Sequence, residues 1–323
     1  EPKELVSLIR LAILKNNLKV LIVLMSVLEK ERLTRLFDNQ KLLLDIVTNG
    51  ADKSLKYLIE TQWVTYSQLR TKGPGGQSLL HVAADKDHAV MVRYLVKSGL
   101  DLESVNEMGE TPLMFATLSG AWRALLELIS LGAAVDSRDT EGGTALFHAV
   151  YYKKYDCLDL LIKNGANVSL SDDSGMTLLH SVALAGDVKG LNMILKHNPP
   201  IHDIDKYGNN AMHYCVMRHD SVGMLIELLK LDISIYQVNA FKRTPLEEAR
   251  YYGMEKSLKV IQSQTQFNNQ LIEACLNGDL KRAKGTRIKG SALMAQLTAR
   301  LNGKTVLEIA LESKFKDLAI WLF

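Results

Sequence analysis

Histidine is the side chain that most often serves as a general base or a zinc ligand near neutral pH. His180 lies within DDSGMTLLHSVALAGD (residues 172–187), where it follows two acids, a glycine and a threonine in an otherwise apolar run. Two further histidines, His81 and His213, lie in similar segments. They are candidates for base catalysis or metal binding, and the choice between these roles and a structural one depends on the elements that hold them.

The other residue types that carry chemistry lack the necessary spacing. The three cysteines, Cys157, Cys215 and Cys275, form no CxxC pair, which favours free thiols in a reducing, cytoplasmic compartment. The glycine-rich GPGGQS (residues 73–78) lacks the Lys-Ser/Thr ending of a phosphate-binding loop, and neither GxSxG nor HExxH occurs. We therefore expect no catalytic residue, no cofactor site and no small-molecule substrate.

Composition narrows the class of partner. Of the 323 residues 47% are hydrophobic, and 39 basic residues nearly balance 36 acidic ones, for a net charge of +3. This charge is too small and too evenly spread for a phosphate-binding surface, so nucleic acid is not the expected partner. The most apolar segment, residues 8–28, is interrupted by two lysines and two asparagines before it reaches the ~18 residues of a membrane span. We expect no membrane insertion.

A fixed period runs through the middle of the chain. The similar segments GQSLLHVAA, GETPLMFA, GGTALFHAV, GMTLLHSVA and GNNAMHYCV begin at positions 76, 109, 142, 175 and 208, each 33 residues after the last. The pattern is D-x-x-G-x-T-P-L-H-x-A-A, then a turn, then L-L-x-x-G-A, as in LLIKNGANVS (residues 160–169). This pattern resembles the ankyrin repeat family. The resemblance implies an all-α fold, an ankyrin-repeat solenoid of stacked helix-turn-helix units with short β-hairpin or loop fingers.

The residues that recur from one unit to the next also have physical reasons for their positions. The pairs Thr111-Pro112 and Thr244-Pro245 suit the start of a helix, because the threonine hydroxyl accepts from an orphan N–H and proline is pre-set for the first turn. Leucine pairs give the second helix its core face, and glycines such as Gly99 suit its end because glycine adopts positive φ easily. One unit alone cannot bury its apolar side, so stability must come from stacking.

The strict match does not extend over the whole chain. We predict degenerate ankyrin-like helical units or an N-terminal cap at residues 1–72, regular ankyrin repeats at 73–263, and irregular C-terminal ankyrin units, cut short, at 264–323. LIEACLNGDLKRAK (residues 271–284) looks like a unit that has lost its hairpin, and we expect a break between two repeat blocks at residues 262–269. The chain starts without methionine and ends on apolar AIWLF, so we expect it to be part of a longer protein.

Within this repeat, the resemblance implies a structural role for the histidines. All three occupy the H of T-P-L-H, where the imidazole bonds to the backbone of adjacent hairpins. Repeats stack about 10 Å apart, too far for a shared zinc whose ligands lie at about 2 Å, so no metal site is expected. The cysteines fall where the repeat has small buried residues. The acidic pairs Asp172–Asp173 and Asp136/Asp139 belong to the D-x-x-G turn, where aspartate bonds its own backbone, and not to a glycosidase dyad.

The remaining candidates form a binding surface. In this family the hairpin tips and the exposed face of the first helix line a concave groove, and tyrosine, methionine, phenylalanine and arginine are enriched in protein interfaces. The alternative is that the tyrosine pairs pack against their own hairpins, or that groove residues are buried against the next repeat. The residues expected to bind a partner are Met108, Glu110, Leu118, Tyr151, Tyr152, Met176, Tyr207, Met217, Arg218, Phe241, Arg243, Tyr251 and Tyr252.

We expect a non-catalytic scaffold or adaptor that binds another protein or peptide in this groove. The alternative is the recruitment or regulatory arm of a larger multidomain enzyme, channel or secreted bacterial effector, which in the last case acts in the host cytosol. An unrecognised catalytic domain in residues 1–72 is disfavoured, because this segment contains neither histidine nor cysteine.

Overall fold

A computed structural model describes residues 2–26, 40–218, 220–285, 300–301, 304–313 and 315. The chain divides into two compact units, Glu1–Asn167 (unit 1) and Val168–Phe323 (unit 2). In both units the described elements are mainly helices joined by loops.

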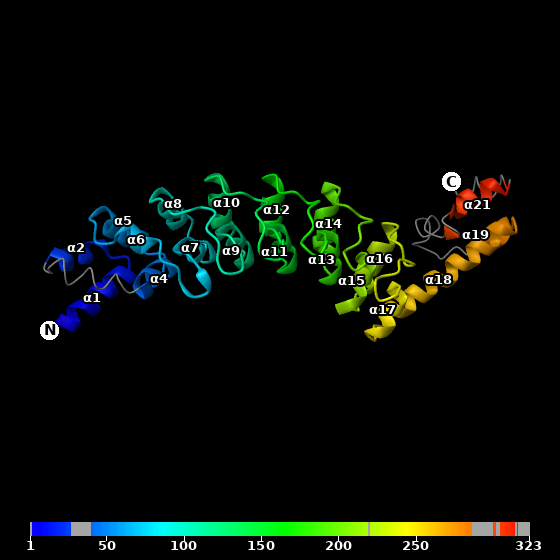
Figure 1. Ribbon diagram of the computed structural model, residues 1–323, viewed down its shortest axis with the longest axis horizontal. Helices are drawn as coiled ribbons and strands as arrows, with labels where there is room; N and C mark the ends of the chain where they lie inside the picture. Colours follow the sequence, from blue (N-terminus) through cyan, green and yellow to red (C-terminus); the bar gives the residue numbers. More distant parts are fainter. Residues whose placement is uncertain are drawn as a thin grey trace. The chain divides into compact units, whose positions relative to one another are not determined.

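Unit 1 is a row of helix pairs (Figure 1). Its first helices pack on one another in the order α7, α9, α11, and its second helices in the order α8, α10, α12. This arrangement confirms the expected stack of helix-turn-helix units. The elements are α1 (Pro2–Leu14), α2 (Leu18–Ser26), α4 (Gln40–Thr48), α5 (Asp52–Glu60), α6 (Tyr66–Leu69), the 3-10 turn η1 (Pro74–Gly76), α7 (Leu79–Asp85), α8 (Ala89–Lys97), α9 (Pro112–Ser119), α10 (Trp122–Ser130), α11 (Ala145–Tyr151) and α12 (Tyr155–Lys163).

Unit 2 continues the same pattern within its own boundaries. Helices α13, α15 and α17 pack in one row, and α14, α16 and α18 in another. Its strands β1 and β2 form a two-stranded antiparallel sheet. The elements are α13 (Leu178–Leu184), α14 (Val188–Ile194), the 3-10 turn η2 (Leu195–His197), α15 (Ala211–Arg218), α16 (Val222–Lys230), α17 (Pro245–Tyr251), α18 (Glu255–Leu276), α19 (Leu280–Gly285), β1 (Arg300–Leu301), β2 (Lys304–Thr305) and α21 (Val306–Glu312).

Helices begin and end at the residues that the repeat pattern indicates. Thr111 and Thr244 accept hydrogen bonds from the third backbone N–H of α9 and α17, and proline follows each of them. After the second helices, Gly99 adopts a φ of 88°, which favours glycine. Gly109 opens its repeat for a further reason, because with a φ of 73° a β-carbon there would lie 2.8 Å from the Thr140 nitrogen of the next hairpin. The letters of the pattern therefore set the local geometry.

The core of each unit includes small and large apolar residues on the first helices and leucines on the second. Ala83, Ala116 and Ala149 are fully buried in unit 1, where they allow neighbouring helices to approach closely. Leu125 and Leu228 are fully buried on α10 and α16. This burial is the packing that the stacked-repeat pattern predicts.

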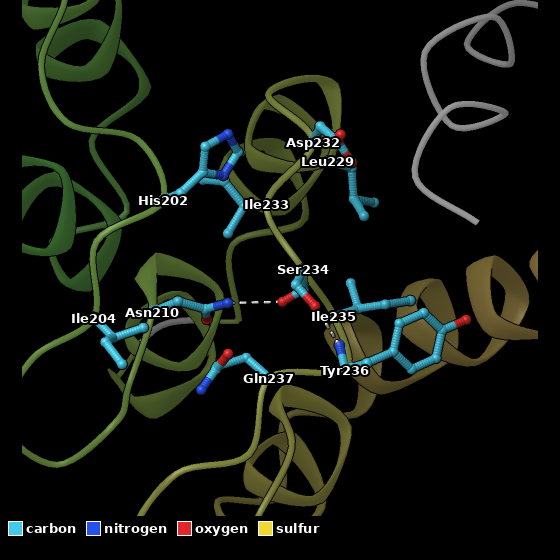
Figure 2. Close-up of a pocket in the computed structure, with 10 residues that line it drawn as sticks. All are labelled: His202, Ile204, Asn210, Leu229, Asp232, Ile233, Ser234, Ile235, Tyr236 and Gln237. Atoms are coloured by element: carbon cyan, nitrogen blue, oxygen red, sulfur yellow. Dashed lines mark hydrogen bonds between the residues drawn. The ribbon is translucent and has the colours of Figure 1, made fainter. Parts of the chain in front are cut away.

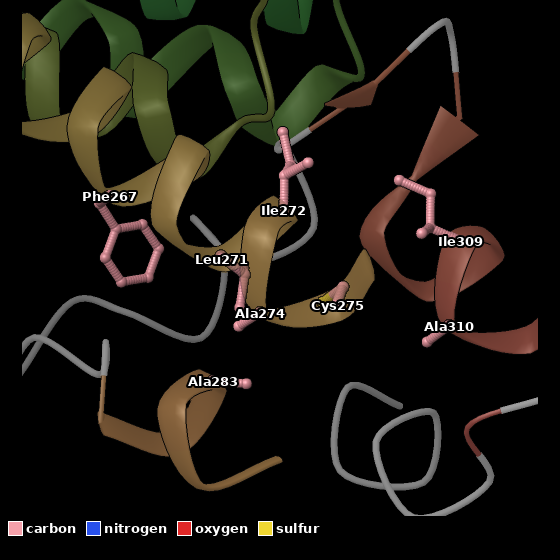
Figure 3. Packing of buried hydrophobic residues seen from close by; sticks show 8 residues of the cluster. All are labelled: Phe267, Leu271, Ile272, Ala274, Cys275, Ala283, Ile309 and Ala310. Carbon is pink, nitrogen blue, oxygen red and sulfur yellow. The ribbon is translucent and has the colours of Figure 1, made fainter. Parts of the chain in front are cut away.

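The C-terminal part of unit 2 departs from the regular repeat. Helix α18 runs without interruption for 22 residues, so the expected break at residues 262–269 is wrong. The segment 255–276 contains no glycine or proline and is rich in helix-forming residues, which explains its continuity. Leu271 and Cys275 near its end are buried against α19 and α21 (Figure 3). Residues 271–284 thus form a helix-turn-helix without a hairpin before it, as expected, while the boundaries at 72/73 and 263/264 stay predictions.

Candidate functional site

Two of the three T-P-L-H histidines bridge successive repeats. In unit 1 the Ser78 backbone N–H donates to His81 Nδ1 at 3.1 Å, and His81 Nε2 donates to the Glu110 carbonyl of the next hairpin at 2.9 Å. In unit 2 His213 Nε2 donates in the same way to the Arg243 carbonyl at 3.1 Å. These contacts confirm the structural role that the resemblance implied.

His180 follows this scheme at only one of its two ring nitrogens. Its Nδ1 accepts from the Thr177 backbone N–H at 2.9 Å, but its buried Nε2 has no hydrogen-bond partner among the described residues. The ring lies 5.2 Å from the ring of Tyr214, in the next repeat of unit 2. The next hairpin still approaches the ring, because the Asp203 backbone interacts with the imidazole and acts to raise its pKa against the larger lowering by burial. The expected bond from His180 to the adjacent hairpin therefore stays a prediction, and the aromatic contact with Tyr214 accompanies it.

The electrostatic environment favours neutral histidines and protonated thiols. Burial lowers the pKa of all three imidazoles from the usual histidine value, so they are neutral near pH 7. Burial also raises the pKa of Cys157 to about 11, of Cys215 to about 12 and of Cys275 to about 11. Such thiols are poor nucleophiles. Within the described ranges, no group of histidine, cysteine and acidic side chains has the arrangement of a metal site.

The hairpins are shaped by one side chain each. Asp139 accepts from the backbone N–H groups of Glu141 and Gly143 at 2.9 and 2.8 Å, as the D-x-x-G pattern predicts. Asp172 accepts from Ser174 and Met176 at 2.9 and 2.8 Å. These bonds confirm that Asp139 and Asp172 build the turns. For Asp136 the expectation is wrong, because its carboxylate accepts from the Asn167 backbone N–H at 3.0 Å.

A second contact, missed from the sequence, fixes the hairpins to their own first helix. Asp139 contacts His148 Nε2 at 3.0 Å. In unit 2 the Tyr214 hydroxyl donates to Asp205 at 2.6 Å, and the Asn239 amide donates to Glu248 at 2.7 Å. In each case the partner lies nine residues after the turn residue, at the position that follows the H of T-P-L-H. A polar residue at this spacing is the signal that could have revealed the contact.

In unit 1 the structure brings together some of the predicted binding residues. Met108, Tyr151 and Tyr152 are 57%, 49% and 50% exposed, and the two tyrosine rings lie 5.0 Å apart in an edge-to-face arrangement. Glu110 is half-buried and accepts from the Asn106 amide at 2.7 Å. Leu118 is half-buried near the end of α9. The tyrosine pair and Met108 are therefore the accessible part of the predicted surface on this unit.

In unit 2 four of the predicted residues are in contact and a fifth, Tyr207, lies on the adjoining hairpin. We name these five residues the arginine-centred cluster: Tyr207, Phe241, Arg243, Tyr251 and Tyr252. The guanidinium of Arg243 lies 4.1 Å from the ring centre of Tyr251 and 5.2 Å from that of Phe241. The Tyr251 and Tyr252 rings are 5.0 Å apart. Tyr207 joins through the backbone, because its carbonyl accepts from the Ala240 N–H at 2.7 Å.

The cluster remains accessible although four of its members are in contact with one another. Tyr251 packs against its own hairpin through Arg243, as the alternative interpretation holds, yet it is 66% exposed, and Phe241 is 62% exposed. The buried Glu248 carboxylate forms an ion pair with Arg243, at 3.3 Å from its Nε. The other predicted residues of unit 2 differ in exposure: Met176 and Met217 are half-buried and Arg218 is exposed.

The structure also contains a cleft of about 550 Å³ in unit 2 that the sequence did not indicate (Figure 2). The loops after α14 and α16 line it with Ile204, Ile235 and Tyr236, and Ile204 is 51% exposed. The Asn210 amide donates to the Ser234 carbonyl at 2.7 Å on its wall. The signal in the sequence was the apolar run ISIY (residues 233–236) in a segment between helices.

A family model for ankyrin repeats (3 copies) matches residues 42–139, 123–205 and 146–239, which together span more than half of the chain. The chain belongs to the ankyrin repeat family. Ankyrin repeats generally bind proteins, and the fold is typically a non-catalytic binding scaffold. No helix in the described part of the chain is long and apolar enough to cross a membrane.

Relatives with a curated description match parts of the chain. It is 36% identical over 97 residues to human protein phosphatase 1 regulatory subunit 27, over 30% of this chain and 61% of that protein. It is 30% identical over 91 residues to the Notch-regulated ankyrin repeat-containing protein of Xenopus laevis, over 28% of this chain and 80% of that protein. A 59-residue stretch, 18% of this chain, is 36% identical to human transient receptor potential cation channel subfamily A member 1, of which it covers 5%.

Solved structures share the fold. The human ASB11 ankyrin repeat domain matches with a TM-score of 0.58 at 20% identity, over 68% of this chain and 96% of that one. The ankyrin repeat domain of Bcl-3 matches with a TM-score of 0.54 at 19% identity, over 79% of this chain and 97% of that one. These similarities confirm the all-α ankyrin solenoid.

Proposed function

We propose that this protein is a non-catalytic scaffold that binds a partner protein or peptide through the hairpin tips and first helices of its repeats. The arginine-centred cluster of unit 2 is the main contact, and Met108 with the Tyr151–Tyr152 pair is a further contact on unit 1. The side chains on these surfaces, rather than the fold, determine which partner binds and how tightly.

The observation that carries this proposal is the exposure of the cluster. Large aromatic side chains and arginine supply most of the binding energy in protein interfaces, because they bury much area at a low cost in conformational entropy. Tyr207, Phe241 and Tyr251 are 53%, 62% and 66% exposed on adjoining hairpins and a helix end. Contiguous apolar surface of this kind is typical of interaction sites.

The cluster is also held in place before a partner arrives. Arg243 is fixed between Tyr251 and Glu248, and Asn239 ties the hairpin to α17 through the same Glu248 carboxylate. Because these side chains lose little freedom on binding, more of the contact energy remains as affinity. The fixed position of Arg243 supports a role of this side chain in recognition rather than in folding alone.

The test is a quantitative capture from cell lysate on immobilised protein, followed by affinity measurement with the purified captured partner. We expect Phe241→Ala and Tyr251→Ala each to weaken binding by about 30-fold, the effect of losing an interface anchor worth about 2 kcal/mol. The matched control is Trp122→Ala on α10, since Trp122 is 42% exposed and also carries an arginine, Arg123, 4.8 Å from its ring. Equal binding by all three variants would contradict the proposal.

A second candidate function is that of a regulatory arm within a larger protein. Its support is that the matched channel is far longer than the aligned repeats, and that another relative is described as a regulatory subunit.

For either function we propose a reducing, cytoplasmic location, which the three free and buried cysteines favour. Assays of enzymatic or channel activity, made on the full-length protein with and without the repeats, distinguish the two functions.

A further inference from the structure

Neighbouring hairpins are joined by a repeating backbone hydrogen bond. In unit 1 the Glu107 N–H donates to the Gly75 carbonyl at 3.0 Å and the Thr140 N–H to the Met108 carbonyl at 2.9 Å. In unit 2 the Lys206 N–H donates to the Ser174 carbonyl at 2.9 Å. The next bond of unit 2 links Ala240 to the Tyr207 carbonyl at 2.7 Å. Within each unit the donor stands one residue before the acceptor of its own hairpin, as Glu107 stands before Met108 and Lys206 before Tyr207.

The first hairpin of unit 1 and the last hairpin of unit 2 each depart from this pattern within their own unit. Pro74 stands 33 residues before Glu107, at the donor position of the first hairpin in unit 1, and proline has no N–H to offer. In unit 2, Phe241 follows the donor Ala240 and therefore occupies the acceptor position of the last hairpin. Its carbonyl accepts no hydrogen bond among the described residues. The residue 33 positions after Ala240 is Glu273, which lies inside α18, so no hairpin donor follows at the regular position.

The loss of this hairpin also uncovers side chains. Leu113, Leu146 and Leu179, at the L of T-P-L-H, are at most 2% exposed, whereas Leu246 at the same position of α17 is half-buried. Leu246 lines a cleft of about 340 Å³ whose other wall is α18. This wall includes Thr265 and the Glu273 carboxylate, which pairs with Arg282 at 2.9 Å. Its other members are four amides that are exposed and make no hydrogen bond among the described residues: Gln262, Gln266, Asn269 and Gln270.

We propose that an extended segment of the partner polypeptide continues this hydrogen-bond pattern at the last hairpin of unit 2. One of its backbone N–H groups donates to the Phe241 carbonyl, and the segment places an apolar side chain on Leu246. Amide side chains offer both a donor and an acceptor, as a peptide backbone does, so the α18 wall suits main-chain recognition. The inference rests on the proposed function and names the kind of segment that binds beside the arginine-centred cluster.

The position of this last hairpin supports a polypeptide rather than a small ligand. Phe241 belongs to the last hairpin before α17 and Leu246 to the first turn of that helix, so one extended chain is long enough to meet both. Addition of a strand to an exposed edge takes its affinity from main-chain bonds and its specificity from side-chain pockets. The aromatic rings of Phe241 and Tyr251, both more than 60% exposed, provide contacts next to the edge.

The experiment selects binders from a phage-displayed library of random 12-residue peptides against the whole chain, and measures the selected peptides by fluorescence anisotropy. Each selected peptide is then made as a series in which one backbone amide at a time is replaced by an ester, which removes one N–H. We expect Leu246→Glu to weaken binding at least tenfold and a single ester position to weaken it about fivefold. Leu126→Glu is the matched control, because Leu126 is 43% exposed on α10 in unit 1.

Thermal melting of both variants checks their folding, and Gln266→Arg, which changes an exposed wall residue, repeats the test if Leu246→Glu is unstable. Selected peptides that lose binding in Tyr251→Ala but tolerate Leu246→Glu, Gln266→Arg and every ester overturn the inference and leave the proposed function intact. Failure to recover any peptide also overturns the inference, while the capture experiment with folded partners decides the proposed function separately.

Discussion

The buried histidines link the stability of the repeats to pH. Burial lowers the pKa of His81, His180 and His213 in the folded chain, whereas the unfolded chain has the ordinary value of about 6.5. The unfolded state therefore binds protons first as the pH falls. The stabilisation from these neutral imidazoles is complete above about pH 6.5 and is lost as the pH falls from there toward the lowered pKa values.

We predict that the free energy of unfolding decreases between pH 7.5 and pH 5.5, by up to about 1.4 kcal/mol for each histidine that remains neutral in the fold. Urea unfolding at the two pH values measures this. His213→Gln is expected to reduce the difference between the two pH values, because it removes one of the imidazoles whose pKa burial lowers. An undiminished difference in His213→Gln contradicts the assignment.

Single residues also show where the sequence was sufficient and where it was not. The roles of His81 and Asp139 could be predicted, because the repeat places one residue type at one position for one purpose. The contacts nine residues further on use histidine, tyrosine and glutamate in turn, so no common letter marks them. The conformation of the hairpin, rather than a residue type, brings these pairs together.

At the scale of elements, side chains in the turn of one helix pair cap the second helix of the next pair. In unit 2 the Asp220 carboxylate accepts from the Ser257 backbone N–H and hydroxyl, both at 2.7 Å, and from the Lys256 N–H at 3.0 Å at the start of α18. In unit 1 Asp87 accepts from the Ala124 N–H of α10 at 2.8 Å. This contact couples successive repeats beyond the apolar packing.

We predict that Asp220→Ala lowers the free energy of unfolding by about 1–2 kcal/mol, because it leaves the first N–H groups of α18 without this acceptor. Burial alone would raise the pKa of Asp220, but the hydrogen bonds from Ser257 and Lys256 lower it. The stabilisation is therefore present above the unfolded value near 4 and is lost as the pH falls through the lowered pKa. Chemical denaturation at pH 7 and at pH 3 measures both effects.

Glu255→Ala is the control for this prediction, because Glu255 is an exposed acid in the same first turn of α18. We expect it to change stability by less than about 0.5 kcal/mol. Equal losses in the two variants would mean that the negative charge near the helix start, and not the cap itself, stabilises the junction.

The elements of the regular repeats were predictable, because threonine, proline and glycine fix the helix ends locally. The continuity of α18 was not predictable from the sequence. The sequence shows only that the pattern stops after α17, and a lost hairpin leaves either an interrupted chain or a longer helix. The burial of Phe267, Leu271 and Cys275 against α19 and α21 accompanies the longer helix, and this packing partner is not visible from the period.

For the whole molecule, a period of 33 residues was enough to predict the fold, because each unit needs its neighbours to bury its apolar side. The candidate site was predictable in part. The repeat frame marked the tips and helix ends, but it could not show that Arg243 connects Phe241 with Tyr251 or that Glu110 is engaged by Asn106. Such contacts depend on rotamers and on neighbouring loops.

Site-specific photo-cross-linking tests the central claim, that partners bind the arginine-centred cluster, most directly. A benzophenone amino acid is introduced in place of Tyr251, and in a control protein in place of Trp122, and both are irradiated in the same lysate. Our account predicts a discrete cross-linked partner from position 251 that is absent from position 122 and is displaced by unlabelled wild-type protein. A partner cross-linked from position 122 and not from position 251 would contradict it.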